Sequence, residues 1–295
     1  MRVLIVEAEG WIGRAAVRQL QLEGMDVLVF GLSPNTASRL FLDRTGVRPI
    51  QVIGDGQLDV AGDAPGQLAR LDAILVAADR GPGKAQDRLT RLIAVASQNG
   101  RPHLIQIATA DAVRRRHAAT RDSEGPGPLD VPAIPTTTLL PTLLDSTMLE
   151  HAAEIATTGQ WRGSAARGAP AFIDPRDVVA CARAVVMKGR GLGRVQLTGP
   201  RHLSYAEVAG ALSTILHREI TYEAVSPEDQ LADLLARGLS HAQAADWVSR
   251  DAMTESQSPA PLTDSVLALT GRAPGSLAAY LEDHRCAFAD GGMLE

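Results

Sequence analysis

The chain has 295 residues, which is long enough for one large domain or two smaller ones with a sizeable buried core. Apolar residues make up 45% and charged residues 21%, so wholesale disorder is excluded. A formal net charge of −5 argues against a nucleic-acid partner, and no apolar run approaches the roughly 18 residues of a membrane-spanning helix. We therefore expect neither a nucleic-acid nor a membrane partner.

Cysteine usage and the first residues bear on metal binding and location. The two cysteines, Cys181 and Cys286, are too few for a zinc site or a disulfide framework, so we expect no metal. Glu7 and Glu9 come before any signal-peptide core could form, which predicts a cytoplasmic protein. Of the 29 basic residues only Lys84 and Lys188 are lysines, and this preference for arginine suggests a bacterial source with a high GC content.

The first 140 residues alternate short apolar runs with segments of helical period. The runs are rich in Val, Ile and Leu without polar alternation, which is typical of strands buried on both faces of a parallel sheet. Between the first two runs, Ile12, Ala16 and Leu20 share one helical face, and Gly24 is a C-terminal stop signal. The runs predict strands at 2–6, 26–30, 47–53, 73–77, 103–108 and 136–140.

Further helices separate the later strands. Ser33 and Pro34 open one helix as N-cap and first-turn proline, and an apolar stripe that ends at Gly100 predicts another. Six strands with intervening helices predict a doubly wound, Rossmann-like α/β domain over residues 1–142. A returning segment, 171–199, is expected to contribute to the same domain.

From residue 143 to 295 the chain becomes mostly helical, which predicts a smaller substrate-binding domain. Asp174, Ser204 and Ser226 each stand in a capping position at the start of a helix. Two short apolar runs remain, and each either extends the sheet or forms a small second layer. They lie at 195–198 and 220–223.

The run 3–6 is followed by Gly10-Trp11-Ile12-Gly13, which gives a strand, a glycine loop and the start of a helix. This opening resembles that of the NmrA-like branch of the atypical short-chain dehydrogenase/reductase superfamily. The resemblance covers nearly the whole chain and implies the doubly wound fold, whereas family members include both reductases and cofactor-sensing regulators. Similar motifs follow at 52–55, 171–178, 197–200 and 203–208.

The glycine loop departs from the family's pattern. Where the family has Gly-Ala-Thr-Gly-x-x-Gly, this chain has Glu7-Ala8-Glu9-Gly10-Trp11-Ile12-Gly13. The first glycine of such a loop permits a tight turn, and the backbone N–H groups receive the pyrophosphate of a dinucleotide. Two like charges a few ångströms apart repel by about 4 kcal/mol near a protein surface. Glu7 and Glu9 therefore predict that tight dinucleotide binding is lost, with Gly10 and Gly13 kept for packing.

The end of the second predicted strand supports the same expectation. An NAD-binding member of the family carries an acidic residue there, and an NADP-binding member carries arginine. Leu32 stands where the arginine would fall. We therefore expect no cofactor, with NADP(H) as the alternative. The residues that would then hold the dinucleotide are Gly10, Trp11, Ile12, Gly13, Leu32 and Asp55.

The usual proton relay of short-chain dehydrogenases is absent, because none of the three tyrosines is followed four residues later by lysine. The sequence also contains no Gly-x-Ser-x-Gly elbow, no His-Glu-x-x-His helix and no phosphate-binding P-loop. The sequence therefore contains none of these motifs of hydrolases, metalloproteases and NTPases.

Polar residues at the carboxyl ends of the predicted strands are the candidates for chemistry, since the ligand cleft of an open α/β sheet lies outside these ends. Crowded carboxylates there suit general acid–base catalysis. Glu7 is the first candidate, and at least one of Glu7 and Glu9 should reach Asp79, Arg80 or Thr109. The catalytic candidates are Glu7, Glu9, Asp79, Asp111 and His117, and the substrate-binding candidates are Arg80, Thr109 and Thr142.

Each candidate also has a purely structural interpretation. Glu7 and Glu9 are then solvated loop residues of a chain that lost its cofactor. Asp55 caps a turn and Asp111 caps a helix. His117 is then a surface histidine. Two other histidines, His151 and His202, have weaker claims.

The sequence thus predicts a small-molecule enzyme that performs isomerisation, dehydration, cyclisation or ring opening without redox chemistry, in bacterial specialised metabolism. Two alternatives stay open. One is an NADP-dependent oxidoreductase that tolerates Glu7 and Glu9, and the other is a non-catalytic sensor or regulatory protein.

Overall fold

The computed structural model divides into two compact units. Unit 1 comprises Met1–Pro141, Arg176–Leu197 and Ala268–Gly271, and unit 2 comprises Thr142–Pro175, Thr198–Leu267 and Arg272–Glu295. No helix in the described part of the chain is long and apolar enough to cross a membrane. The residues described are 1–6, 8, 10–30, 48–50, 52–53, 59–60, 68, 70–77, 92–94, 96–97, 100–108, 134–256 and 261–290.

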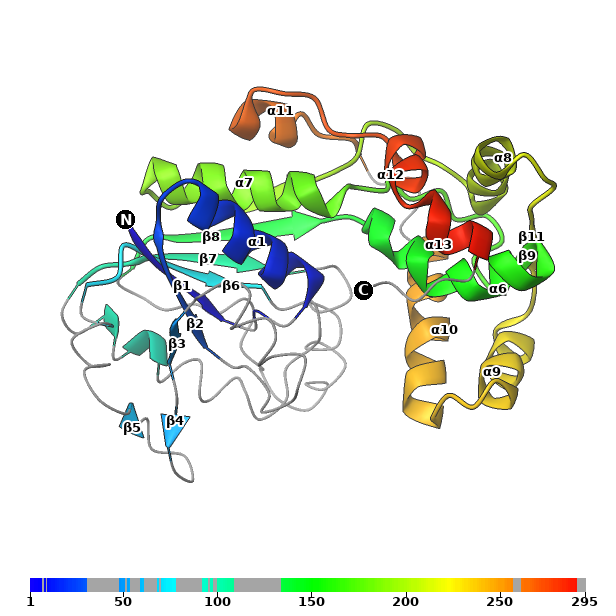
Figure 1. Ribbon diagram of the computed structural model, residues 1–295, viewed down its shortest axis with the longest axis horizontal. Helices are drawn as coiled ribbons and strands as arrows, with labels where there is room; N and C mark the ends of the chain where they lie inside the picture. The colour runs from blue at the N-terminus through cyan, green and yellow to red at the C-terminus, as the bar shows by residue number, and fades with distance from the viewer. Residues whose placement is uncertain are drawn as a thin grey trace. The chain divides into compact units, whose positions relative to one another are not determined.

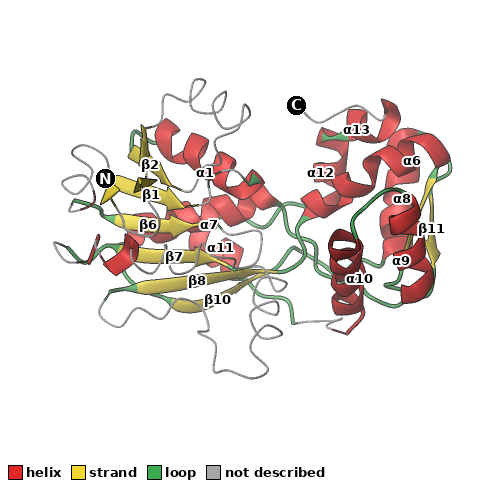
Figure 2. Cartoon of the chain, turned by 90° about the horizontal axis from the view of Figure 1, so that it is seen from below, coloured by secondary structure: helices red, strands yellow, loops and turns green. Residues whose placement is uncertain are grey.

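Unit 1 is built on a seven-stranded sheet in the order β10-β8-β7-β6-β1-β2-β3 (Figure 1). All its strand pairs are parallel, and Figure 2 shows the strands side by side from β2 to β10. The doubly wound α/β fold predicted from the apolar runs is therefore confirmed. The strands are β1 (Arg2–Val6), β2 (Asp26–Phe30), β3 (Arg48–Ile50), β6 (Ala73–Val76), β7 (His103–Ile107), β8 (Thr136–Pro141) and β10 (Gly193–Leu197).

The core of unit 1 lies around the central strands, where Leu4, Leu28, Ile74 and Leu104 are fully buried. Among the described helices of this unit are α1 (Trp11–Leu22) and α7 (Pro175–Lys188). The predicted face of α1 is buried. The chain leaves α1 at Gly24, whose φ of +74° favours glycine.

The third predicted strand differs from the structure. The run 47–53 contains two short strands, β3 and β4 (Val52–Ile53). β4 pairs antiparallel with β5 (Asp59–Val60), outside the main sheet. Pro49 and Gln51 interrupt the apolar residues of this run, and the sequence prediction gave these interruptions no weight.

Unit 2 combines helices with a two-stranded parallel sheet. Its strands are β9 (Gln160–Gly163) and β11 (Thr221–Ala224), which place Trp161 opposite Tyr222. α11 (Ser265–Thr270) crosses the boundary between the units. The other helices are η1 (Asp145–His151), α6 (Ala152–Thr158), α8 (Tyr205–Leu216), α9 (Pro227–Ala236), α10 (His241–Ser256), α12 (Leu277–Asp283) and α13 (Arg285–Asp290).

The predicted caps of two helices in unit 2 are present. The Ser204 hydroxyl accepts a hydrogen bond from the Glu207 N–H, and the Glu207 carboxylate accepts one from the Ser204 N–H, which makes a capping box at α8. Ser226 likewise caps α9, accepting from the Asp229 N–H. These local signals fix where α8 and α9 begin.

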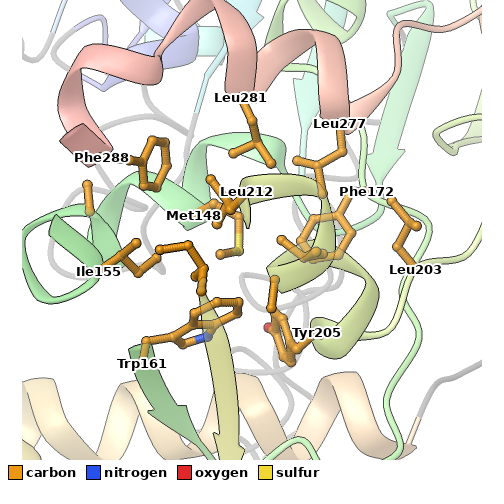
Figure 3. Packing of buried hydrophobic residues seen from close by; sticks show 14 of the residues in the cluster. Met148, Ile155, Trp161, Phe172, Leu203, Tyr205, Leu212, Leu277, Leu281 and Phe288 are labelled. Atoms are coloured by element: carbon orange, nitrogen blue, oxygen red, sulfur yellow. The ribbon is translucent and has the colours of Figure 1, made fainter. Parts of the chain in front are cut away.

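An apolar cluster lies at the core of unit 2 (Figure 3). Two of its large members, Trp161 and Phe172, are almost completely buried. At one side the backbone of Gly199 approaches that of Phe172 so closely that a Cβ atom on Gly199 would lie 1.6 Å from the Phe172 carbonyl oxygen. The labelled members in Figure 3 are Met148, Ile155, Trp161, Phe172, Leu203, Tyr205, Leu212, Leu277, Leu281 and Phe288.

Candidate functional site

The turn from β1 into α1 is the described part of the predicted site. Gly10 is the N-cap of α1 in an extended conformation, with φ −66° and ψ 164°. No side chain among the described residues caps this helix, and none in its first turn is acidic. The free N–H groups and the positive end of the helix dipole together form a seat for an anion.

This turn lies where the strand order of the sheet reverses. β1 has β2 on one side and β6 on the other, and Val6 at its end pairs with Phe30 and Val76. The Ala77 N–H donates to the Val6 carbonyl at 3.1 Å, which holds the end of β6 beside the end of β1. In open α/β sheets the crevice at such a reversal is where ligands bind.

Side chains next to the turn divide into buried and exposed. Ile12 and Gly13 are buried, which supports a packing role for this face of α1. Trp11, by contrast, is 39% exposed at the first position of the helix. The turn therefore offers backbone donors and one accessible indole, both within a few residues of the sheet's carboxyl edge.

Most of the other predicted site residues lie outside the described residues, so their proximity and roles stay predictions. Thr142 is described: its hydroxyl donates to the Ala171 carbonyl. Through this hydrogen bond Thr142 has a structural role in unit 2. The residues outside the described part are Glu7, Glu9, Leu32, Asp55, Asp79, Arg80, Thr109, Asp111 and His117.

An aromatic cluster in unit 2 escaped the sequence prediction. Aromatic residues are only 3% of the chain, yet two of the three tryptophans and two of the three tyrosines gather here. The ring centroids of Trp161 and Tyr222 are 5.2 Å apart, and those of Tyr205 and Tyr222 are 5.0 Å apart. The pairing of β9 with β11 brings Trp161 and Tyr222 together, and no spacing within the sequence predicts this pairing.

A carboxylate borders the two tyrosines. The Oδ2 atom of Asp251 accepts hydrogen bonds from the Ser164 N–H at 2.9 Å and from the Gln230 Nε2 at 2.7 Å. Burial raises the pKa of Asp251. Burial first, and then the Asp251 charge, also raise the pKa of Tyr205 and of Tyr222. Both phenols therefore stay protonated and can serve as hydrogen-bond donors, not as bases.

Two histidines with weaker claims are now placed. The Nδ1 of His202 donates to the Ala169 carbonyl at 3.0 Å, which is a structural contact. His151 stands edge-on to Trp247 with 5.0 Å between ring centroids. Burial first, then the Arg250 and Arg237 charges, lower the pKa of His151 to about 3, so its imidazole is neutral. His151 in this state cannot act as a general acid.

Metal ligands do not cluster in the residues that the structure describes, because no three His, Cys, Asp or Glu side chains come together there.

Relatives match the whole length of the chain, although no family model matches it. An NAD(P)H azoreductase from Xenophilus azovorans is 27% identical over 295 residues, covering 97% of this chain and 99% of the relative. A (4-alkanoyl-5-oxo-2,5-dihydrofuran-3-yl)methyl phosphate reductase from Streptomyces griseus is 26% identical, with the same two coverages. An NADPH-dependent quinone oxidoreductase from Escherichia coli, solved with NADPH, has a TM-score of 0.74 at 18% identity and covers 96% of this chain and 99% of its own.

These relatives correct one expectation. The prediction that the chain has no cofactor is wrong, because the similar proteins are NAD(P)H-dependent reductases and one solved neighbour is complexed with NADPH. The cofactor-independent isomerase type has no support either. The prediction weighed the side chains of Glu7, Glu9 and Leu32, whereas a pyrophosphate seat is made mainly of backbone N–H groups, and no described side chain caps those at the start of α1.

Proposed function

We propose that this chain, which has the fold of the NmrA-like, atypical short-chain dehydrogenase/reductases, is an NAD(P)H-dependent reductase of a small organic molecule. The observation that carries the proposal is the N-terminus of α1, which no described side chain caps and which lies at the reversal of the parallel sheet. The full-length similarity to reductases supports it. The alternative of an oxidoreductase is therefore favoured over non-redox chemistry.

The residues of the turn fit a dinucleotide. The N–H groups of Trp11 and Ile12 begin α1 and would receive the pyrophosphate. Gly10 would let the phosphate approach the backbone closely, since it has no side chain. The dinucleotide, when bound, supplies the hydride. In this proposal Glu7 and Glu9 weaken the affinity for the phosphates without abolishing it, because the backbone donors remain.

Reduction of an organic acceptor also requires a proton, and the chain lacks the tyrosine–lysine pair that usually provides one in short-chain dehydrogenases. Glu7 is our first candidate for this proton, with Glu9, Asp79, Asp111 and His117 as the others. An arginine and a threonine at the strand ends, Arg80 and Thr109, would orient the acceptor.

The names of the relatives indicate a class of acceptor. An azo compound, a quinone and an oxo-dihydrofuran each contain a conjugated, electron-poor bond. We therefore propose a conjugated acceptor for this chain, and we expect a panel with these three groups to contain a substrate.

Titration with NADPH and with NADH tests the cofactor directly. The emission of Trp11 should fall on binding, because NADPH absorbs where tryptophan emits and Trp11 adjoins the proposed seat. Trp11→Phe should remove this change, whereas the matched variant Trp247→Phe, in unit 2, should retain it. Calorimetry then gives the affinity without a fluorophore.

Two outcomes would decide against the proposal. Absence of binding of either dinucleotide at millimolar concentration would exclude the cofactor. Binding without oxidation of NADPH in the presence of the whole acceptor panel would favour the non-catalytic sensor.

A further inference from the structure

The α9–α10 hairpin (residues 227–256) attaches to the rest of unit 2 differently from the other helices. None of its residues belongs to the apolar cluster at the core of the unit (Figure 3). Its own buried apolar residues are few in the described structure, with Leu234, Ala244 and Met253 among them. Hydrophobic burial therefore contributes less to holding this hairpin than to holding α6, α8 or α12.

Polar contacts take the place of apolar packing at this interface. Arg162 of β9 pairs with Asp233 of α9. The carboxylate of Glu255, on α10, accepts hydrogen bonds from the Arg167 N–H at 2.7 Å and from the Gly168 N–H at 2.9 Å. The Asp251 carboxylate likewise accepts a hydrogen bond from the Ser164 N–H. Each of these contacts requires one partner on the hairpin and one on the body of the unit.

Two ion pairs of the interface flank one histidine. Arg250 of α10 contacts Glu150 at 2.7 Å, and Arg237 at the end of α9 contacts Glu154 at 2.7 Å. Glu150 and Glu154 lie one residue before and three residues after His151 in the sequence. The hairpin thus places two guanidinium groups around His151, and both nearby carboxylates are already paired.

The half-buried ring of His151 lies beside aromatic residues from both sides of the interface. Its centroid lies 5.0 Å from that of Trp247 on α10 and 6.1 Å from that of Trp161 on β9. Its Nδ1 atom is buried and has no hydrogen-bond partner among the described residues. A proton on this ring would therefore create a third cation beside Arg250 and Arg237, with no acceptor for the new N–H.

We propose that His151 is an acid-released latch of the α9–α10 hairpin: the closed hairpin keeps the imidazole neutral, and a protonated His151 holds the hairpin open. The latch is a property of unit 2 and does not depend on the proposed reductase activity.

The sign and size of the effect follow from linkage. In the closed state the pKa of His151 is lowered to about 3, mainly by burial, against 6.5 for the exposed ring. The contribution to closure is complete above pH 6.5 and is lost as the pH falls toward 3. Between about pH 7.5 and 5.5 the equilibrium constant for opening should rise about tenfold, since only the open state takes up the proton.

Asp251 titrates in the opposite sense. Its pKa is raised in the closed state by burial, so acid favours closure through this carboxyl. Arg250, Tyr205 and Tyr222 are among the ionisable groups that interact with it. A comparison of two proteins that both contain Asp251 cancels its contribution and isolates that of His151.

Hydrogen exchange of the full chain at about pH 7.5 and 5.5, corrected for the intrinsic pH dependence of exchange, measures the opening. The wild type is compared with His151→Phe, which keeps an aromatic ring against Trp247 without a titrating nitrogen. We expect acid to increase opening of α10 about tenfold more in the wild type than in the variant. The amides of α8, a helix of the same unit, should show no such difference.

Three results would overturn the latch. The first is an equal response of α10 to acid in the wild type and in His151→Phe. The second is an equal gain of exchange in α8 and α10, which would mean that the whole unit opens. The third, read by NMR titration of the wild-type protein, is an imidazole that titrates near 6.5 while the hairpin stays closed.

If His151→Phe does not fold, His151→Gln replaces it in the exchange experiment. The NMR titration needs no variant and is therefore an independent readout.

Discussion

Gly199→Ala should destabilise unit 2 strongly, although it adds a single methyl group. The new Cβ would lie 1.6 Å from the Phe172 carbonyl oxygen, and atoms of this kind essentially never approach within 3.0 Å. The carbonyl would have to retreat by at least the difference, 1.4 Å. It belongs to the backbone of a buried residue, and the next residue, Ile173, donates its N–H to Leu143 at 2.9 Å. Overpacking costs about 3 kcal/mol and one weakened hydrogen bond costs about 1 kcal/mol. The free energy of unfolding should therefore fall by about 4 kcal/mol.

Urea unfolding followed by the fluorescence of Trp161, which is buried in the same unit, measures this loss. Gly210→Ala is the matched control, because Gly210 lies in α8 with open space around its Cβ position. The control should stabilise the helix by up to about 1 kcal/mol. If the free energy of unfolding of Gly199→Ala lies within about 1 kcal/mol of the wild-type value, that result contradicts the close approach of these two backbone segments.

Four other substitutions test separate parts of the argument. Glu7→Gly should tighten NADPH binding at least tenfold in calorimetry, because a carboxylate near the pyrophosphate is removed; unchanged affinity would place Glu7 away from the seat. Glu7→Gln should lower turnover of an identified acceptor by roughly 10² to 10⁴ if Glu7 supplies the proton, and wild-type turnover would pass that role to Asp79 or Asp111. Ser204→Ala should cost about 1 kcal/mol in urea unfolding through loss of the α8 cap, and a neutral result would contradict the capping box. Asp251→Asn should become less stable relative to the wild type as the pH falls from 7 toward 3.8, since the raised pKa of Asp251 makes proton uptake favour the folded state; parallel pH profiles would contradict it.

The sheet could be predicted from the sequence because its strands are buried on both faces. Such strands read as unbroken apolar runs, and the runs at 2–6 and 26–30 coincide with β1 and β2. Helix starts were predictable where a capping residue marks them, as at Ser204 and Ser226. The division of 47–53 into two strands was missed because the prediction treated the run as one apolar segment, although Pro49 and Gln51 interrupt it.

The candidate site was only partly accessible to sequence reasoning. The β1–α1 turn is a local motif, so Gly10 and Gly13 pointed to it. The aromatic cluster of unit 2 depends on residues far apart in the chain, such as Trp161 and Tyr222, and on a strand pairing that no spacing announces. The error about the cofactor arose because the prediction gave the charges of Glu7 and Glu9 more weight than the backbone N–H groups at the start of the helix.

The strand order of the main sheet has a consequence for how the chain folds during its synthesis. β10 pairs with β8 but follows it by more than fifty residues, all of the intervening chain up to Pro175 belonging to unit 2. A nascent chain that has emerged only as far as Pro141 therefore presents the edge of β8 without its neighbour, and unpaired edges recruit other chains. Expression of residues 1–141 alone should yield aggregates, whereas extension through Leu197 should provide the missing strand.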